Sequence, residues 1–130
     1  MVAKKQHKLE ESLSQLEQAI LFYRDKKSPE EMRYLAVSKA FEIAVEYAWK
    51  ELKRLVEEEG IEAVSPKEAV RQSARLGLIG SAEDWLNYLD LRNSGVHDYF
   101  SVDKKDFIAY ASDFLKESKR IFQKPHKTSL

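Results

Sequence analysis

Four side chains that could act together on a phosphate group fall within eight positions of this 130-residue chain. Arg92, Asn93, His97 and Tyr99 lie in the stretch LRNSGVHDYF, and His97 is one of only three histidines. Histidine can move a proton near neutral pH, and the planar guanidinium of arginine binds phosphate through two hydrogen bonds. These residue types suit the cleavage of a phosphodiester bond in RNA.

In such a reaction His97 would transfer a proton at the ribose 2′-hydroxyl or at the leaving oxygen, while Arg92 would hold the phosphate. RNA carries its own nucleophile, so this chemistry requires no serine, cysteine, metal ion or cofactor, and we expect none. One histidine fills only one of the two proton-transfer roles. A symmetric dimer that brings two copies of the site together would supply the second.

A helix must position these residues, and its apolar face includes the arginine. Trp85 and Leu89 recur at helical spacing, and Arg92 continues the same stripe. A buried guanidinium needs a partner. We therefore expect either an ion pair inside the protein, with Glu42 or Glu46 as the partner, or a position in a cleft or subunit interface. Both glutamates could equally be exposed acids on a helix flank.

The helix must also end before the histidine. His97 lies five residues after Arg92, about 140° further around an unbroken helix, so the two side chains would diverge. Gly95 offers an end, because glycine readily adopts the left-handed conformation that closes a helix. Arg92, Asn93, His97 and Tyr99 would then face one pocket. The alternative is an ordinary helix end, where the helix dipole favours arginine and histidine.

The rest of the chain predicts an all-α fold. Apolar residues recur every three or four positions in three further long segments, at about 9–23, 29–59 and 103–122. A short helix is expected between Pro66 and Gly77. Four helix starts are predicted: Ser28 with Pro29 and Glu31; Ser65 with Pro66; Ser81; and Ser101 or Asp103. Gly60 is predicted to end the second helix. We predict an up-and-down antiparallel bundle of four long helices plus one shorter helix.

The amino-acid composition limits the possible classes of protein. Twenty-two basic and 22 acidic residues give a net charge of zero, which argues against coating nucleic acid by bulk charge. Without cysteine, disulfides and thiolate metal sites are excluded. We expect a single domain over residues 1–130, with a core at about 8–122 and frayed termini. No secretory signal and no membrane span are expected, which favours the cytoplasm.

Three landmarks resemble one known family. They are F-E-x-x-x-E-x-x-W-K from Phe41 to Lys50, G-L-I at residues 77–79, and R-N-x-x-x-H-x-Y from Arg92 to Tyr99. In this order they are similar to nucleotidyltransferase substrate-binding proteins, also called HepT-like proteins, of the HEPN superfamily. The resemblance covers about Leu9 to Ile121, and its last motif is the most specific.

The resemblance implies a function for the residues that match its motif. It implies a homodimeric helical bundle in which Arg92 and His97 are the catalytic pair of a ribonuclease toxin from a two-gene module. It implies a minimal nucleotidyltransferase as partner and antitoxin, which transfers AMP from ATP to Tyr99. Another view of the family implies a subunit that binds substrate or nucleotide for a two-chain transferase.

The chain departs from the family pattern at two positions. An arginine often precedes the Phe-Glu pair, whereas Ala40 stands there in this chain. Where such an arginine contacts phosphate, its replacement weakens binding. Gly95 lies in the middle of the last motif, where family members often carry small polar residues, and it loosens the backbone there.

Overall fold

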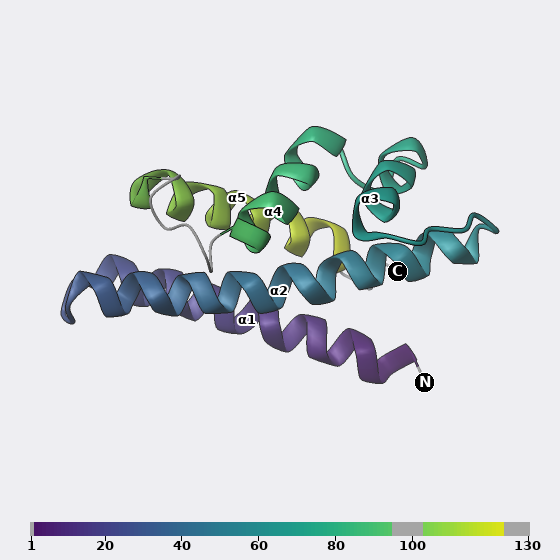
Figure 1. Cartoon of the computed structure of the whole chain (residues 1–130). Coiled ribbons are helices and arrows are strands. Elements are labelled where there is room, and N and C mark those ends of the chain that lie inside the picture. The colour runs from purple at the N-terminus through teal and green to yellow at the C-terminus, as the bar shows by residue number, and fades with distance from the viewer. Residues whose placement is uncertain (1, 95–102, 124–130) are drawn as a thin grey trace.

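The computed structural model describes residues 2–94 and 103–123, and these ranges form five α-helices without a strand (Figure 1). The helices are α1 (Val2–Asp25), α2 (Glu30–Glu58), α3 (Pro66–Arg75), α4 (Ala82–Ser94) and α5 (Lys104–Phe122). The all-α class and the short third helix are confirmed for this part of the chain. None of the five helices offers the apolar run that a bilayer crossing requires.

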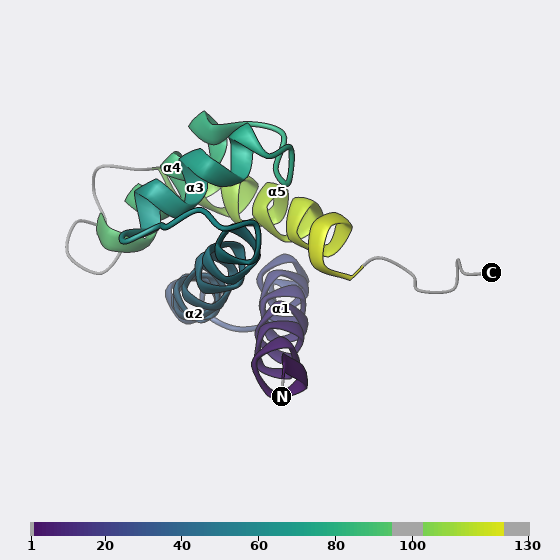
Figure 2. The same cartoon turned by 90° about the vertical axis from the view of Figure 1, so that its right-hand side faces the viewer.

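The helices form two layers. α1 and α2 are an antiparallel hairpin, and α3, α4 and α5 cover one side of it, as the end-on view in Figure 2 shows. α5 runs antiparallel to α1, and Lys119 Nζ on α5 lies 2.8 Å from Glu17 Oε1 on α1. α4 descends obliquely toward α2 (Figure 1). This crossing brings the end of α4 against the middle of the longest helix.

Most helix boundaries follow from local signals in the sequence. The Ser65 hydroxyl accepts a hydrogen bond from the Glu68 amide at 3.1 Å, so the predicted cap of α3 is confirmed. The Ser81 hydroxyl accepts one from the Asp84 amide at 3.1 Å, which confirms the predicted start of α4. Gly60 follows the end of α2 with a φ of +83°, a conformation that suits glycine.

The predicted start of α2 is wrong in its details. Pro29 is the cap residue and makes no side-chain cap bond, so Ser28 does not cap the helix with Glu31 as predicted. The buried Arg33 uses the preceding turn instead. Its guanidinium donates to the carbonyl of Ser28 at 2.7 Å and to the carbonyl of Tyr23. A long side chain from within α2 therefore fixes the turn that the serine was expected to fix.

The core that holds α4 in place is aromatic. Phe114 of α5 is fully buried, and its ring meets those of Phe41, Trp85 and Tyr88 edge to face at centroid distances of 5.4, 5.5 and 5.4 Å. Such pairs add to the stabilisation from burial alone. Because Phe41 lies on α2 and Trp85 and Tyr88 lie on α4, the ring of Phe114 joins three helices. It thereby sets the position of α4 relative to α2.

Replacement of Phe114 by alanine therefore tests the core. We expect Phe114→Ala to lower the free energy of unfolding by about 3–5 kcal/mol, because it removes a buried ring and leaves a cavity. Urea unfolding followed by circular dichroism measures the change. The control Phe22→Ala removes a ring that is 37% exposed, and we expect a loss of about 1 kcal/mol or less. Equal losses in the two variants would contradict this account of the core.

Candidate functional site

Arg92 lies near the end of α4 and forms an ion pair with α2. Its Nη1 is 2.5 Å from Glu46 Oε1, and its Nη2 donates to Asn93 Oδ1 at 3.1 Å. Of the two partners predicted for this arginine, Glu46 is therefore correct. Glu42 instead lies 3.6 Å from Lys39 of its own helix. The arginine predicted to fall on the apolar face of α4 is paired across the helix crossing.

Glu46 is held ionised by several groups at once. Burial acts to raise its pKa, but hydrogen bonds from Lys50 and Trp49 and the charge of Arg92 outweigh burial, so the pKa is lowered. Lys50 Nζ lies 3.0 Å from Glu46 Oε2, and Trp49 Nε1 donates to Oε1 at 3.2 Å. The carboxylate is thus a fixed negative charge, able to orient the guanidinium beside it.

The guanidinium retains capacity for an anion. Its side chain is only 22% exposed, and its buried Nε has no hydrogen-bond acceptor in the part of the chain described. A guanidinium carries five N–H groups, and the bonds to Glu46 and Asn93 engage two of them. Unpaired donors on a buried cation are costly unless something uses them. A bound phosphate would be a suitable acceptor for the remaining N–H groups of the terminal guanidinium nitrogens.

Arg92 opens onto a groove of about 430 Å³ along α2. The groove is lined by three cationic side chains against two carboxylates, which leaves one net positive charge; the residues are Lys39, Glu42, Ile43, Glu46, Tyr47, Lys50 and Arg92. A groove with excess positive charge and a fixed guanidinium favours an anionic ligand. Both glutamates predicted to support the site lie in it.

An apolar stripe of α2 leads into this groove. Met32, Leu35 and Ile43 are 62%, 45% and 37% exposed, and Ile43 also lines the groove. Large apolar side chains that gather on one exposed face commonly mark an interaction surface. The stripe and the groove thus form one continuous face of α2.

The second half of the predicted site lies outside the described residues. Gly95, which was expected to end the helix, falls there, as do His97 and Tyr99. α4 is described as far as Ser94. The approach of His97 to Arg92 therefore stays a prediction from the sequence.

The groove residues Lys39, Ile43 and Tyr47 were not predicted from the sequence motifs. The available signal was their spacing along one long helix, since positions 39, 43, 46 or 47, and 50 recur every three or four residues and share a face. Glu46 and Lys50 of the landmark from Phe41 to Lys50 lie on this face, but the landmark does not include the other three residues. Only the crossing of α4 over α2 shows that this side of α2 faces Arg92.

The structure is thus a small all-helical fold in which a paired arginine lines a groove with excess positive charge. The chain belongs to the family described as nucleotidyltransferase substrate binding protein like, whose model matches residues 4–127. The resemblance drawn from the three sequence landmarks is thereby confirmed.

Individual relatives agree with this assignment. The chain is 34% identical over 83 residues to a Haemophilus influenzae protein named probable ribonuclease HepT; the match covers 60% of this chain and 57% of that protein. It is also similar to the solved structure of HI0074 from Haemophilus influenzae, described as the fold of a substrate binding domain of a nucleotidyltransferase. That likeness has a TM-score of 0.77 and 26% identity over 91% of this chain and 96% of the other. A crystal structure of a Thermus thermophilus protein matches with a TM-score of 0.75 and 25% identity, over 88% and 96% of the two chains.

The ion pair between Arg92 and Glu46 should make the stability of the folded protein depend on pH. The pKa of Glu46 is lower in the folded protein than the ordinary value of 4.5, so its pairing stabilises the fold above that pH. This stabilisation is lost as the pH falls through the lowered pKa. We therefore expect Glu46→Gln to be less stable than wild type at pH 7, and the difference to shrink on acidification. Urea unfolding at a series of pH values measures it.

The matched control is Glu42→Gln. Glu42 lies one turn away on α2 with a similar exposed fraction, but within the described ranges its carboxylate pairs with the exposed Lys39 and not with Arg92. We expect a small effect on stability at every pH. A Glu46→Gln variant whose stability loss does not depend on pH, or equals that of Glu42→Gln, would show that the Arg92 pair does not stabilise the fold.

Proposed function

We propose that this chain is a metal-independent endoribonuclease of the HepT type, and that Arg92 and His97 are its catalytic pair. One observation carries the proposal: Glu46 and Asn93 hold Arg92 in a cationic groove, five residues before a histidine. Membership of the nucleotidyltransferase substrate binding family and similarity to a protein named probable ribonuclease HepT support it.

The proposed chemistry uses only the substrate and the side chains of histidine and arginine. A histidine accepts the proton of the ribose 2′-hydroxyl, and the 2′-oxygen attacks the adjacent phosphorus. The bond to the 5′-oxygen breaks, and that oxygen takes up a proton. The products are a 2′,3′-cyclic phosphate and a free 5′-hydroxyl. Arg92 binds the phosphate oxygens and stabilises the negative charge that builds up on them.

A homodimer completes the proposed site. His97 of one chain can serve one proton transfer, and His97 of the second chain can serve the other. The exposed apolar stripe of Met32, Leu35 and Ile43 supports pairing through α2, because it adjoins the Arg92 groove. Pairing there would bury the stripe and bring the two grooves together.

The proposal also includes control of RNA cleavage by a partner protein. The family description supports a nucleotidyltransferase as the partner. We propose that this partner acts as the antitoxin of a two-gene module and transfers AMP to the Tyr99 hydroxyl. A bulky anionic group two residues from His97 would compete with the RNA phosphate for Arg92.

A second candidate function rests on the description of the HI0074 structure as a substrate binding domain of a nucleotidyltransferase. In this alternative the groove binds a nucleotide or another phosphate-bearing substrate and presents it to a transferase subunit. It predicts saturable binding to the transferase or to a nucleotide, without RNA cleavage. A purely structural role for Arg92 predicts that Arg92→Ala lowers stability and changes nothing else.

Cleavage of RNA in EDTA by the purified protein tests the proposal. The protein is produced without any nucleotidyltransferase, so that Tyr99 stays unmodified. We expect the wild type to cut, and His97→Ala to cut about 10²–10⁴-fold more slowly, because a proton-transfer group is lost. Circular dichroism and size-exclusion chromatography establish that both proteins are folded dimers. If both are folded and neither cuts, the binding-subunit alternative replaces the enzyme.

Replacement of Tyr99 separates control from catalysis. We expect Tyr99→Phe to cut RNA at a rate close to wild type, because the proposed chemistry does not use its hydroxyl. Incubation with the nucleotidyltransferase and ATP should silence the wild type and add one AMP group to its mass. Tyr99→Phe should gain no mass and stay active. Silencing of Tyr99→Phe to the same extent would place the modification elsewhere.

A further inference from the structure

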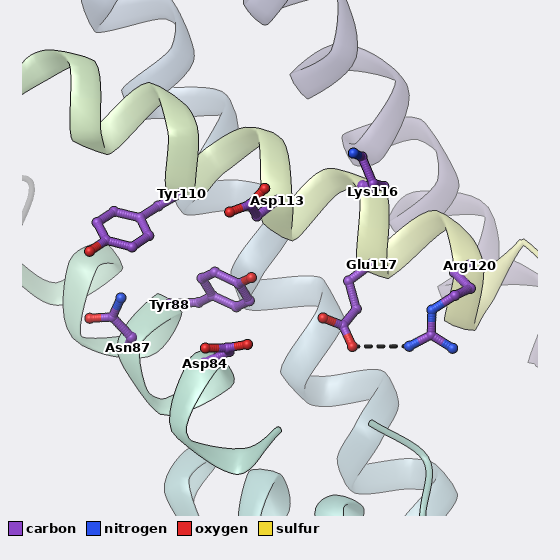
Figure 3. A pocket seen from close by; sticks show the side chains of 8 residues that line it. All are labelled: Asp84, Asn87, Tyr88, Tyr110, Asp113, Lys116, Glu117 and Arg120. Atoms are coloured by element: carbon purple, nitrogen blue, oxygen red, sulfur yellow. Dashed lines mark hydrogen bonds and ion pairs between the residues drawn. The ribbon is translucent and has the colours of Figure 1, made fainter. Parts of the chain in front are cut away.

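A second pocket lies between α4 and α5, away from Arg92. It has a volume of about 500 Å³ and shares no lining residue with the Arg92 groove (Figure 3). Its lining is unlike that of the groove, because carboxylates and tyrosines predominate. Asp84 and Tyr88 come from α4, and Tyr110, Asp113 and Glu117 come from α5.

The Tyr88 hydroxyl is the unusual group of this pocket. The side chain is 96% buried, since its exposed fraction is 4%, and its ring packs against Trp85 and Phe114. Among the residues described, nothing forms a hydrogen bond with its hydroxyl, which points into the pocket between Asp113 and Asp84 (Figure 3). A covered tyrosine normally has a partner for its hydroxyl. This one faces a cavity instead.

Two carboxylates of the pocket have no ion pair among the residues that the structure describes. Asp84 and Asp113 form no ion pair within the described ranges, whereas Glu117 lies 3.0 Å from Arg120 Nη2. Lys116 contributes to the lining, but its ammonium points away from the Tyr88 hydroxyl in Figure 3. Burial, and then the charges of Asp84, Glu117 and Asp113, raise the pKa of Tyr88. The hydroxyl therefore stays protonated in a region of negative potential.

The geometry points to a binding site for the arginine side chain of a partner polypeptide, held by Asp84, Asp113 and the Tyr88 hydroxyl. The two aspartates approach from different helices, so a planar guanidinium between them can donate to both. The hydroxyl oxygen of Tyr88 can accept a further N–H bond. At the rim, the ring of Tyr110 is 38% exposed and offers a face for the cation to stack on.

Other ligand classes fit less well. A bare metal ion would need several convergent ligands, and the described residues contain no cluster of three or more His, Cys, Asp or Glu side chains placed to hold one. An anion would meet two unpaired carboxylates. Glu117 already binds one guanidinium, that of Arg120, at the edge of the same pocket. The pocket thus accepts this group within its own chain.

Arg120 is a cationic side chain of the same pocket. It is 63% exposed, lines the pocket and pairs with Glu117, so its charge opposes the entry of a second guanidinium. Removal of Arg120 frees Glu117 and makes the pocket more negative. Arg120→Ala should therefore bind an arginine peptide more tightly than wild type, by about three-fold or more, as expected for one screened charge.

The test is a titration of the full chain at low salt with a capped tri-arginine peptide, followed by amide ¹H–¹⁵N NMR. We expect saturable shifts centred on α4 and α5 around Tyr88. Asp113→Asn should weaken binding about ten-fold, because a charge-assisted hydrogen bond is lost, and Tyr88→Phe about three-fold or more. Tyr88→Phe should fold as stably as wild type, since no hydrogen bond within the described chain is lost.

Matched controls distinguish a specific binding site from nonspecific electrostatic attraction. Glu83→Gln removes the same charge one residue from Asp84, outside the pocket lining, and should leave binding unchanged. A tri-citrulline peptide of the same shape without charge should not bind. The inference is overturned by absence of saturable binding, or by equal losses in Glu83→Gln and Asp113→Asn. It is also overturned if the citrulline peptide binds as well as the arginine peptide. Tighter binding of spermidine with the same dependence on Asp113 would overturn it too, because the ligand would then be a free polyamine. None of these outcomes depends on RNA cleavage.

Discussion

A guanidinium that cannot lose its proton, placed on the apolar face of α4, is the constraint on which this structure depends. Desolvation of Arg92 is tolerable only because Glu46 meets it from α2, and Glu46 is itself held by Trp49 and Lys50. This pairing requires α4 to cross α2 at one place. The ring of Phe114, packed between α2 and α4, maintains that crossing. The core and the site are therefore coupled, and the half-buried charge is oriented before any ligand arrives.

Much of the fold could be predicted because its signals are local. Ser65 and Ser81 cap the next turn, and Gly60 ends α2, whatever the rest of the chain does. Ser28 does not cap α2, because the cap position falls one residue later, at Pro29, and Arg33 binds the carbonyl of Ser28. Arg92 could be recognised by its place on an apolar stripe. The choice between Glu42 and Glu46 could not be made, because it depends on where two helices cross. Tyr88 was missed because a tyrosine among core aromatics gives no sign that its hydroxyl points into a pocket.

The chain has no net charge, yet it concentrates charge of opposite sign in two places. The groove along α2 carries excess positive charge around Arg92, and the pocket between α4 and α5 carries Asp84 and Asp113, which have no ion pair among the described residues, around Tyr88. α4 contributes to both. The proposed phosphate-bearing ligand suits the first surface and the proposed arginine side chain suits the second.

The central claim is that Glu46 acts on RNA cleavage through Arg92. A double-mutant cycle of kcat/KM for RNA cleavage, with Glu46→Gln, Arg92→Lys and the double variant, measures this most directly. The account predicts that Glu46→Gln slows the wild type but has little further effect once Arg92 is lysine, because the group that Glu46 orients is already gone. Independent effects that multiply in the double variant, or a wild type that does not cut RNA, would contradict it.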